Sequence, residues 1–383
     1  PSQTLAVAGL QALSVVGDRP EGAALLGWTE HDRQPAYASP VAASAGDAEP
    51  IFVNFGATGS GKSLLMLWKA VQYARLGSPQ VLIDPKLGSD HSAVVMTIPG
   101  SHVYSLDSLQ HADGVFDPIR FSLQPEVGIE LAASMLVSID PWSGMASKLE
   151  TEVYTALKYG VDNGAKCIGE ALRLAFHAKR ATIDLVKPVL DLANASPLFR
   201  ACIGFKNETE GLRMASGITY IKVGNTYLDL PEAGSLENAT LMQRVSLALV
   251  RMMVFGSQMA LTHRRGVIHL DEAWVFLGAG KAEMQRLGRL ARSQEVLPEL
   301  YTQKATDALD AGLAGSISRG LILPLDREEA KAALEMFKVE ATEEVLTRLT
   351  AKATMADGED TAPNWNSFRA LRDPETKENL RGT

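Results

Sequence analysis

The sequence is poor in several features that would point away from an ordinary globular protein. Cysteine occurs only at Cys167 and Cys202, which excludes a disulfide framework and is typical of a reducing compartment. Positive charge is not in excess, because 37 Lys and Arg stand against 45 Asp and Glu, giving a net charge of −8. A broadly basic nucleic-acid surface is therefore not expected, although a local basic patch stays possible.

Long apolar runs are also missing. The best candidate for a membrane span, Leu241–Leu261, is interrupted by four polar or charged residues and predicts a buried amphipathic helix instead. The mildly apolar Leu5–Val16 has no positive flank, so it is a poor signal peptide. Hydrophobic residues make up 46% of the chain, which is enough for a substantial core. Because the chain begins at Pro1, we expect it to be part of a longer protein.

Short apolar runs alternate with helical periodicity in the first and last thirds of the chain. This alternation predicts an α/β fold with a mostly parallel sheet and right-handed crossovers. Residues 1–50 are predicted to precede the core, and 29–50 within them are predicted to form a loop. The predicted strands are 51–55, 80–83, 102–106, 266–270, 299–302 and 320–325, and the predicted helices are 62–76, 236–261, 281–292 and 326–350.

The middle of the chain has a different pattern. Residues 126–198 carry apolar residues three or four positions apart, with few strand candidates, which predicts an all-α insertion. Residues 218–230 alternate around Gly224-Asn225 and predict a β-hairpin. We therefore expect a first core part at 1–125, an all-α insertion at 126–205, a second core part at 206–350 and a polar tail at 351–383.

The sharpest motif is GATGSGKS at residues 56–63, which fits G-x-x-x-x-G-K-[ST] between a predicted strand and a predicted helix. Such a phosphate-binding loop (P-loop, Walker A) turns backbone N–H groups towards a phosphate, at the positive end of a helix dipole. Lys62 would reach the β- and γ-phosphate oxygens, and the Ser63 hydroxyl would hold Mg²⁺. The predicted nucleotide-binding residues are Gly56, Thr58, Gly59, Ser60, Gly61, Lys62, Ser63 and Leu64.

A second motif, VIHLDEAW at residues 267–274, places two acids after a predicted buried strand. This is the Walker B arrangement, in which Asp271 would hold the Mg²⁺ shell and Glu272 would orient or deprotonate the attacking water. Acidic pairs after apolar runs are common, so the motif gains its weight from the P-loop in the same chain. Glu272 favours hydrolysis over passive nucleotide binding.

Other polar residues give weaker signals. Gln303, at the end of the next predicted strand, is a candidate sensor of the γ-phosphate or an ordinary loop residue. Asp84 ends a predicted strand at the same sheet edge and either supports the site or caps a turn. The seven His residues show no metal-ligand spacing.

Several arginines are candidates for an arginine finger that reaches a nucleotide across a subunit interface. Arg286, Arg289 and Arg292 recur every three residues and so share one face of a predicted helix. That face is either a solvated basic stripe or the source of the finger, for which Arg292 is the first choice. Arg319 is the second candidate.

Together these motifs resemble a known family. GATGSGKS, then HLDEAWVFL about 200 residues later, then an Arg-containing helix and YTQ resemble the type IV secretion and conjugative-transfer ATPases of the TraC and VirB-four class, which are related to HerA and FtsK motors. The resemblance covers about residues 20–380, the motor half of that family. It implies a RecA-like P-loop NTPase core with an all-α insertion between the Walker motifs.

The resemblance also implies an activity and a setting. It implies a Mg²⁺-dependent ATPase at the cytoplasmic base of a secretion channel, peripheral to the inner face of the bacterial cell membrane. Its expected partners are other channel subunits, a coupling protein and further copies of itself in a hexamer. One alternative is a DNA-translocating coupling protein or HerA/FtsK-type pump, which should show a basic pore loop and DNA contact. Another is a nucleotide-gated assembly scaffold with little turnover.

Overall fold

The structure is a computed structural model, and the residues that it describes form two β-sheets. The residues that it describes are 19–29, 33–39, 51–109, 113–208, 211–212, 216–223, 228–230, 238–273, 276, 288, 291, 293–310 and 317–350. The larger sheet has seven strands in the order β5-β6-β4-β7-β8-β3-β9, and every neighbouring pair runs parallel. Its strands are β3 (Ile51–Phe55), β4 (Gln80–Asp84), β5 (His102–Ser105), β6 (Ile218–Lys222), β7 (Val267–Leu270), β8 (Leu297–Thr302) and β9 (Ile317–Ile322). The predicted α/β class with a parallel sheet is confirmed.

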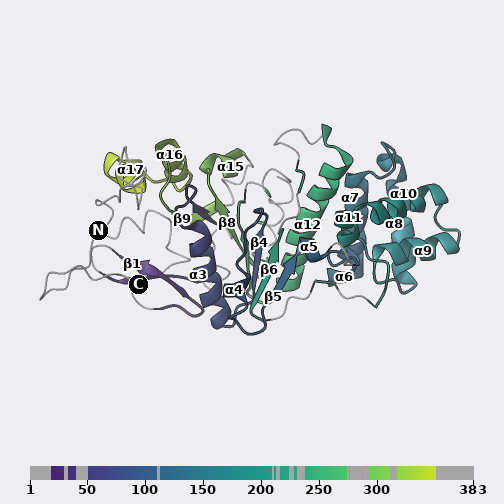
Figure 1. Ribbon diagram of the computed structural model, residues 1–383, viewed down its shortest axis with the longest axis horizontal. Coiled ribbons are helices and arrows are strands. Elements are labelled where there is room, and N and C mark those ends of the chain that lie inside the picture. The colour runs from purple at the N-terminus through teal and green to yellow at the C-terminus, as the bar shows by residue number, and fades with distance from the viewer. Residues whose placement is uncertain are drawn as a thin grey trace, which may run out of the picture.

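Helices cover both faces of this sheet. Side chains such as Leu82 and Tyr301 pack with those of α3 (Lys62–Arg75) on one face. Alternate side chains such as Ile83 and Leu270 point to the other face and join the main core. There α12 (Leu241–Leu261) packs on β7, and α16 (Arg327–Met336) packs on β9. Strands buried on both faces are typical of parallel sheets, and Figure 1 shows β4 and β6 between α3 and α12.

A group of helices follows the first strands and precedes β7. It consists of α7 (Pro125–Ile139), α8 (Ala146–Asp162), α9 (Ile168–His177), α10 (Ile183–Ala195) and α11 (Pro197–Cys202). The sequence marks where α10 and α11 begin, because the Thr182 and Ser196 side chains cap the first turns. The helices lie beyond α12 at one end of the molecule (Figure 1). The all-α insertion is therefore confirmed as part of the fold, while its boundaries as a domain, 126–205, stay a prediction.

Helix α12 is long and apolar enough to cross a membrane by length and composition alone, with a mean hydropathy of 1.2. However, 78% of the residues in that window are buried inside the protein, where α12 packs against α7 and α11. Its start is fixed by a capping box, in which the Thr240 and Gln243 side chains each bond to the other's backbone N–H. The prediction of a buried helix is confirmed, and the helix begins at Leu241 rather than at 236.

Two predictions about strands are wrong. The first half of the predicted hairpin at 218–230 is β6, which pairs in parallel with β4 on one side and β5 on the other and so has no hairpin partner. Thr219 and Tyr220 of β6 are both buried, because a central strand is covered on both faces. The alternation of polar and apolar residues in the sequence therefore did not indicate a hairpin. The predicted loop at 29–50 contains β2 (Pro35–Ala38), which pairs antiparallel with β1 (Ala24–Trp28). Bonds to α3 hold this small sheet, including Trp68 Nε1 donating to Leu25 O at 2.8 Å.

Most of the remaining boundaries differ by a few residues, but the predicted helical stretch 326–350 is divided into α16 and α17 (Glu343–Thr350), and residues 337–342 between them are not helical. Strands β8 and β9 begin earlier than predicted, and β8 includes Pro298. Pro298 pairs with Ile268 of β7 on one side, while the pairing of β8 with β3 on the other side starts only at Glu299. Pro298 therefore lies where β8 has one neighbouring strand. The other helices whose bounds the described residues define are α4 (Ser92–Val95), α5 (Leu106–Leu109), α6 (Pro118–Phe121) and α15 (Ala305–Asp310). Of the predicted helix at 281–292 the structure describes only residues 288 and 291, both of which are helical, and the tail at 351–383 lies outside the described residues.

Candidate functional site

The predicted P-loop, the two Walker B acids and Gln303 follow three adjacent strands, which are β3, β7 and β8 respectively. Since these strands are parallel, the segments after them meet at one sheet edge, where open α/β sheets bind ligands. The P-loop follows β3 and is tied to the neighbouring strand ends by backbone bonds. Gly56 N donates to Thr302 O at 3.2 Å, and Ala57 N donates to Pro324 O at 2.8 Å.

The P-loop is a tight turn that needs glycine. Gly59 and Gly61 have φ values of +79° and +96°, in the left-handed region that residues with a Cβ rarely adopt. Gly56 leaves no room for a side chain, since a Cβ there would lie 2.4 Å from Ser60 Oγ. The Lys62 ammonium donates to Gly56 O at 2.7 Å and to Ala57 O at 3.0 Å, so it lies inside the curl of its own loop. Burial lowers its pKa, while the charges of Glu272 and Asp271 act to raise it.

The structure brings the two motifs into direct contact. Ser63 Oγ donates to Asp271 Oδ2 at 3.0 Å, although the two residues are 208 positions apart. Burial raises the pKa of Asp271, and the neighbouring carboxylate of Asp84 raises it further. A hydroxyl and a carboxylate are the oxygen donors that Mg²⁺ prefers, so these residues fit a magnesium ion.

A second contact links the P-loop to the other acid. Thr58 Oγ1 donates to Gln303 Oε1 at 2.7 Å, and Gln303 Nε2 lies 3.0 Å from both carboxylate oxygens of Glu272. The backbone of Glu272 has a φ of +46°, a conformation that costs a non-glycine residue about 1–2 kcal/mol. Such strain is concentrated at functional sites, where the surroundings impose it. The connection from Thr58 through Gln303 to Glu272 has no signal in the sequence.

Asp84 and His91 also face this site. His91 Nε2 lies 3.5 Å from Asp84 Oδ2, and ligand atoms of Asp84, His91 and Asp271 all lie within 4.8 Å of one another. The three residues could therefore hold a cation. Asp84 also caps its turn, as Oδ1 accepts a bond from Lys86 N at 2.9 Å. Sequence spacing did not reveal His91, because the fold rather than the chain brings it to Asp271.

The structure places the other predicted site residues at different positions. Thr58, Gly59, Ser60 and Gly61 form the loop itself, while the Leu64 side chain is 73% exposed on the first turn of α3. Arg319 is in the middle of β9 and only 1% exposed, so it cannot reach across a subunit interface from this position. The remaining candidates for the arginine finger, Arg286, Arg289 and Arg292, lie outside the described residues.

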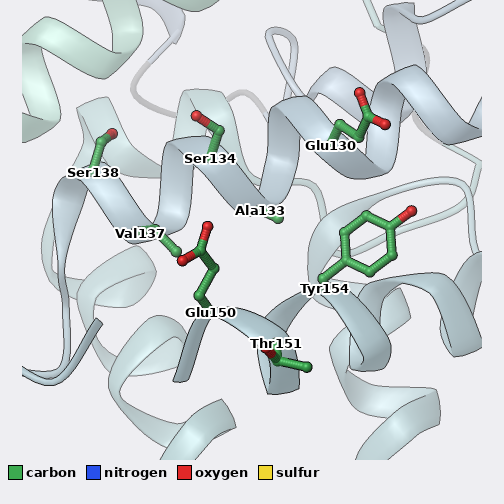
Figure 2. A pocket seen from close by; sticks show the side chains of 8 residues that line it. All are labelled: Glu130, Ala133, Ser134, Val137, Ser138, Glu150, Thr151 and Tyr154. Carbon is green, nitrogen blue, oxygen red and sulfur yellow. The ribbon is translucent and has the colours of Figure 1, made fainter. Parts of the chain in front are cut away.

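A groove of about 540 Å³ lies elsewhere, between α7 and α8. Glu130 and Val137 of α7 and Glu150 and Tyr154 of α8 line it, and Figure 2 shows the two glutamates coming from facing helices. No predicted site residue that the structure describes lines this groove. It is therefore a separate feature of the helical insertion.

Comparison with protein families matches residues 43–359 to the family described as AAA-like domain. The chain belongs to this AAA-like family. The matched range includes both the P-loop and the acids that follow β7. Comparison with curated proteins finds no match.

Solved structures with a similar fold include VirB4 of Thermoanaerobacter pseudethanolicus. The TM-score is 0.60 at 14% identity, over 88% of this chain and 93% of that one. The conjugative coupling protein TrwB, in a trigonal form with sulphate, gives a TM-score of 0.42 at 16% identity, over 74% of this chain and 72% of that one. TrwB with ADP and Mg²⁺ gives 0.40 at 14% identity, over 75% and 73%. The match to VirB4 confirms the fold that the motif resemblance implies for this AAA-like chain.

Proposed function

We propose that the protein is an ATP-hydrolysing motor of a type IV secretion or conjugation system, which energises channel or pilus assembly and substrate transfer. The observation that carries the proposal is the contact between the two motifs. Ser63 of the P-loop bonds to Asp271, and Gln303 bridges Thr58 and Glu272. Membership of the AAA-like family and the fold shared with VirB4 support it.

In this proposal different residues of the chain bind the nucleotide, hold the metal and activate water. The P-loop amides and Lys62 bind the phosphates of ATP, and Ser63 and Asp271 hold Mg²⁺. When bound, Mg²⁺ would neutralise phosphate charge. Glu272 orients the attacking water and accepts its proton. Gln303 senses the γ-phosphate and passes that information to Glu272.

The proposal extends to the assembly. The active form is a hexamer at the cytoplasmic face of the cell membrane, in contact with channel subunits and a coupling protein. Arg292 of one copy reaches the nucleotide of the next as the arginine finger. These points rest on the resemblance of the motifs to type IV secretion ATPases. A DNA-translocating pump and a scaffold with little turnover are the competing outcomes.

Substitution of Glu272 tests the catalytic assignment. We expect Glu272→Gln to lower the rate of ATP hydrolysis by about 100-fold or more, because it removes the general base, while the Kd for ATP changes less than about threefold. The measurements are phosphate release and equilibrium nucleotide binding. Glu340→Gln, at an exposed position, is the matched control and should hydrolyse ATP like the wild type. Equal rates for wild type and Glu272→Gln would show that Glu272 is not the base.

A further inference from the structure

Below the candidate site, an ion pair is buried between α3 and the sheet. Lys69 Nζ of α3 lies 2.8 Å from Glu299 Oε2 of β8, and the two side chains are 0% and 1% exposed. The ammonium also lies 4.1 Å from the centroid of the Phe52 ring. Burial acts to raise the pKa of Glu299, but the charge of Lys69 and the bond from His269 lower it to about 2, so the carboxylate is ionised.

Further polar side chains extend this pair across the sheet. Tyr301 OH donates to Glu299 Oε2 at 2.7 Å and lies 3.2 Å from His269 Nδ1. The other imidazole nitrogen, His269 Nε2, lies 2.8 Å from Gln80 Oε1 of β4. All of these side chains are buried. We call the set Lys69, Gln80, His269, Glu299 and Tyr301 the buried polar network.

The residues of the buried polar network lie on the same faces of α3, β7 and β8 as the residues of the candidate site. Alternate residues of a strand point to the same face, so His269 shares a face with Asp271, which follows two residues later. In the same way Glu299 and Tyr301 share a face of β8, and Gln303 comes two residues after Tyr301, just beyond the end of the strand. Glu299 pairs directly with His269 in the register of the two strands. On α3, Lys69 is seven residues after Lys62, two turns along the same buried face.

Stability alone does not account for such a network. Removing two charges from water costs several kcal/mol per ion, and apolar side chains of similar volume often stabilise a core equally well or better. The surrounding layer, with Met66 and Leu82, is apolar. What an ionic network adds is a requirement for one particular alignment, since a shifted helix would leave buried charges unpaired.

We propose that the buried polar network positions the P-loop helix α3 on strands β7 and β8, so that Ser63 meets Asp271 and Gln303 meets Glu272. Its members are positioning residues, because they act through the strand ends and touch no substrate. This inference rests on the proposed ATPase function and deepens it. It predicts that the network matters more for turnover than for stability.

The test compares two single hydroxyl deletions. Tyr301→Phe removes the hydroxyl that joins His269 and Glu299. Tyr73→Phe removes a buried hydroxyl of α3 that has no hydrogen-bond partner in the part of the chain that the structure describes, and it is the matched control. We expect Tyr301→Phe to lower kcat about three- to tenfold, as for one lost hydrogen bond, with the Kd for ATP nearly unchanged. Tyr73→Phe should keep the wild-type kcat. Equal kcat values for both variants at equal Tm would overturn the proposal.

The double variant Lys69→Met/Glu299→Gln removes both charges and leaves neither one unpaired. We expect it to keep a Tm close to that of the wild type and to lose about tenfold or more in kcat. Wild-type kcat in a folded double variant would contradict a positioning role. If this variant does not fold, the Tyr301→Phe comparison still decides.

Amide hydrogen exchange separates this inference from the proposed function. Segments 271–273 and 301–304 should exchange faster in Tyr301→Phe than in Tyr73→Phe, whether or not the wild type hydrolyses ATP. An inactive wild type with this exchange difference would count against the ATPase function alone. Equal exchange in both variants would count against the network.

Discussion

At the P-loop, a single added methyl group is enough to disturb the geometry. A Cβ on Gly56 would lie 2.4 Å from Ser60 Oγ, 2.9 Å from Leu323 Cβ and 3.1 Å from Lys62 Cγ. The loop would have to move away from β9 and carry Lys62 with it. The position of the phosphate-binding groups therefore depends on this one residue.

We expect Gly56→Ala to weaken ATP binding about tenfold or more, because the displaced loop no longer presents its N–H groups together. Gly27→Ala is the control, since nothing lies within 4 Å of a Cβ there and the backbone φ is not in the left-handed region. Titration with a fluorescent ATP analogue gives both affinities. Wild-type affinity in Gly56→Ala would mean that the loop binds ATP in another shape.

The sequence located the main residues of the candidate site but not all of their connections. Ser63 and Asp271 were predicted to share a magnesium site because each motif has a defined chemistry, and the fold brings them together. The bond from Thr58 to Gln303 depends on how two strand ends are aligned, which no local pattern encodes. The same holds for His91. The role of Arg292 stays a prediction.

At the scale of helices and strands, local patterns predicted most of the sheet. The P-loop strand and β7 are short, mostly apolar runs with clear ends, and the helix after the P-loop has apolar residues at helical spacing. The error at β6 has a physical cause: a short alternating run looks the same in a hairpin and in a central parallel strand, and only the partner strands distinguish them. The sequence analysis missed both strands of the small sheet. Strand β2, PAYA, consists mostly of proline and alanine, which are depleted in strands, and β1, ALLGW, contains alanine and glycine, which are depleted too.

Asp117 shows how one residue joins several elements. It caps α6, where Oδ1 accepts from Ile119 N at 3.0 Å. Its Oδ2 accepts from Ile168 N and Gly204 N, each at 2.8 Å, so it ties α6 to both ends of the segment that holds α9 to α11. The side chain is completely buried, and burial raises its pKa from 3.8 to about 7 although the three N–H bonds act against this.

This raised pKa predicts a pH dependence of stability. Between pH 4 and 7 the unfolded chain loses the Asp117 proton while the folded chain keeps it, so the stability that this group contributes falls as the pH rises. We expect the free energy of unfolding of the wild type to fall relative to Asp117→Asn between pH 5 and 8, by at most about 3 kcal/mol. Urea unfolding at several pH values measures it, with Asp191→Asn, 60% exposed, as the control. A constant difference between wild type and Asp117→Asn across this range would contradict the raised pKa.

At the scale of the whole molecule, the fold places the candidate site at one edge of the central sheet, and the helical insertion lies at one end of the molecule (Figure 1). The AAA-like family and the VirB4-like fold are compatible with both a secretion motor and a related DNA pump. The net charge of −8 favours the secretion motor modestly, since DNA binding relies on contacts to phosphates. An arginine finger supplied by a second copy would make activity depend on assembly.

The most direct test of the account is the rate of ATP hydrolysis as a function of protein concentration, with and without single- and double-stranded DNA, for the wild type and Lys62→Ala. For a secretion motor with a shared site we expect a wild-type rate that rises faster than linearly with protein concentration and does not respond to DNA, and we expect no hydrolysis by Lys62→Ala. Strong stimulation by DNA would indicate a translocase. The absence of hydrolysis by the wild type at every concentration would contradict the proposed motor function.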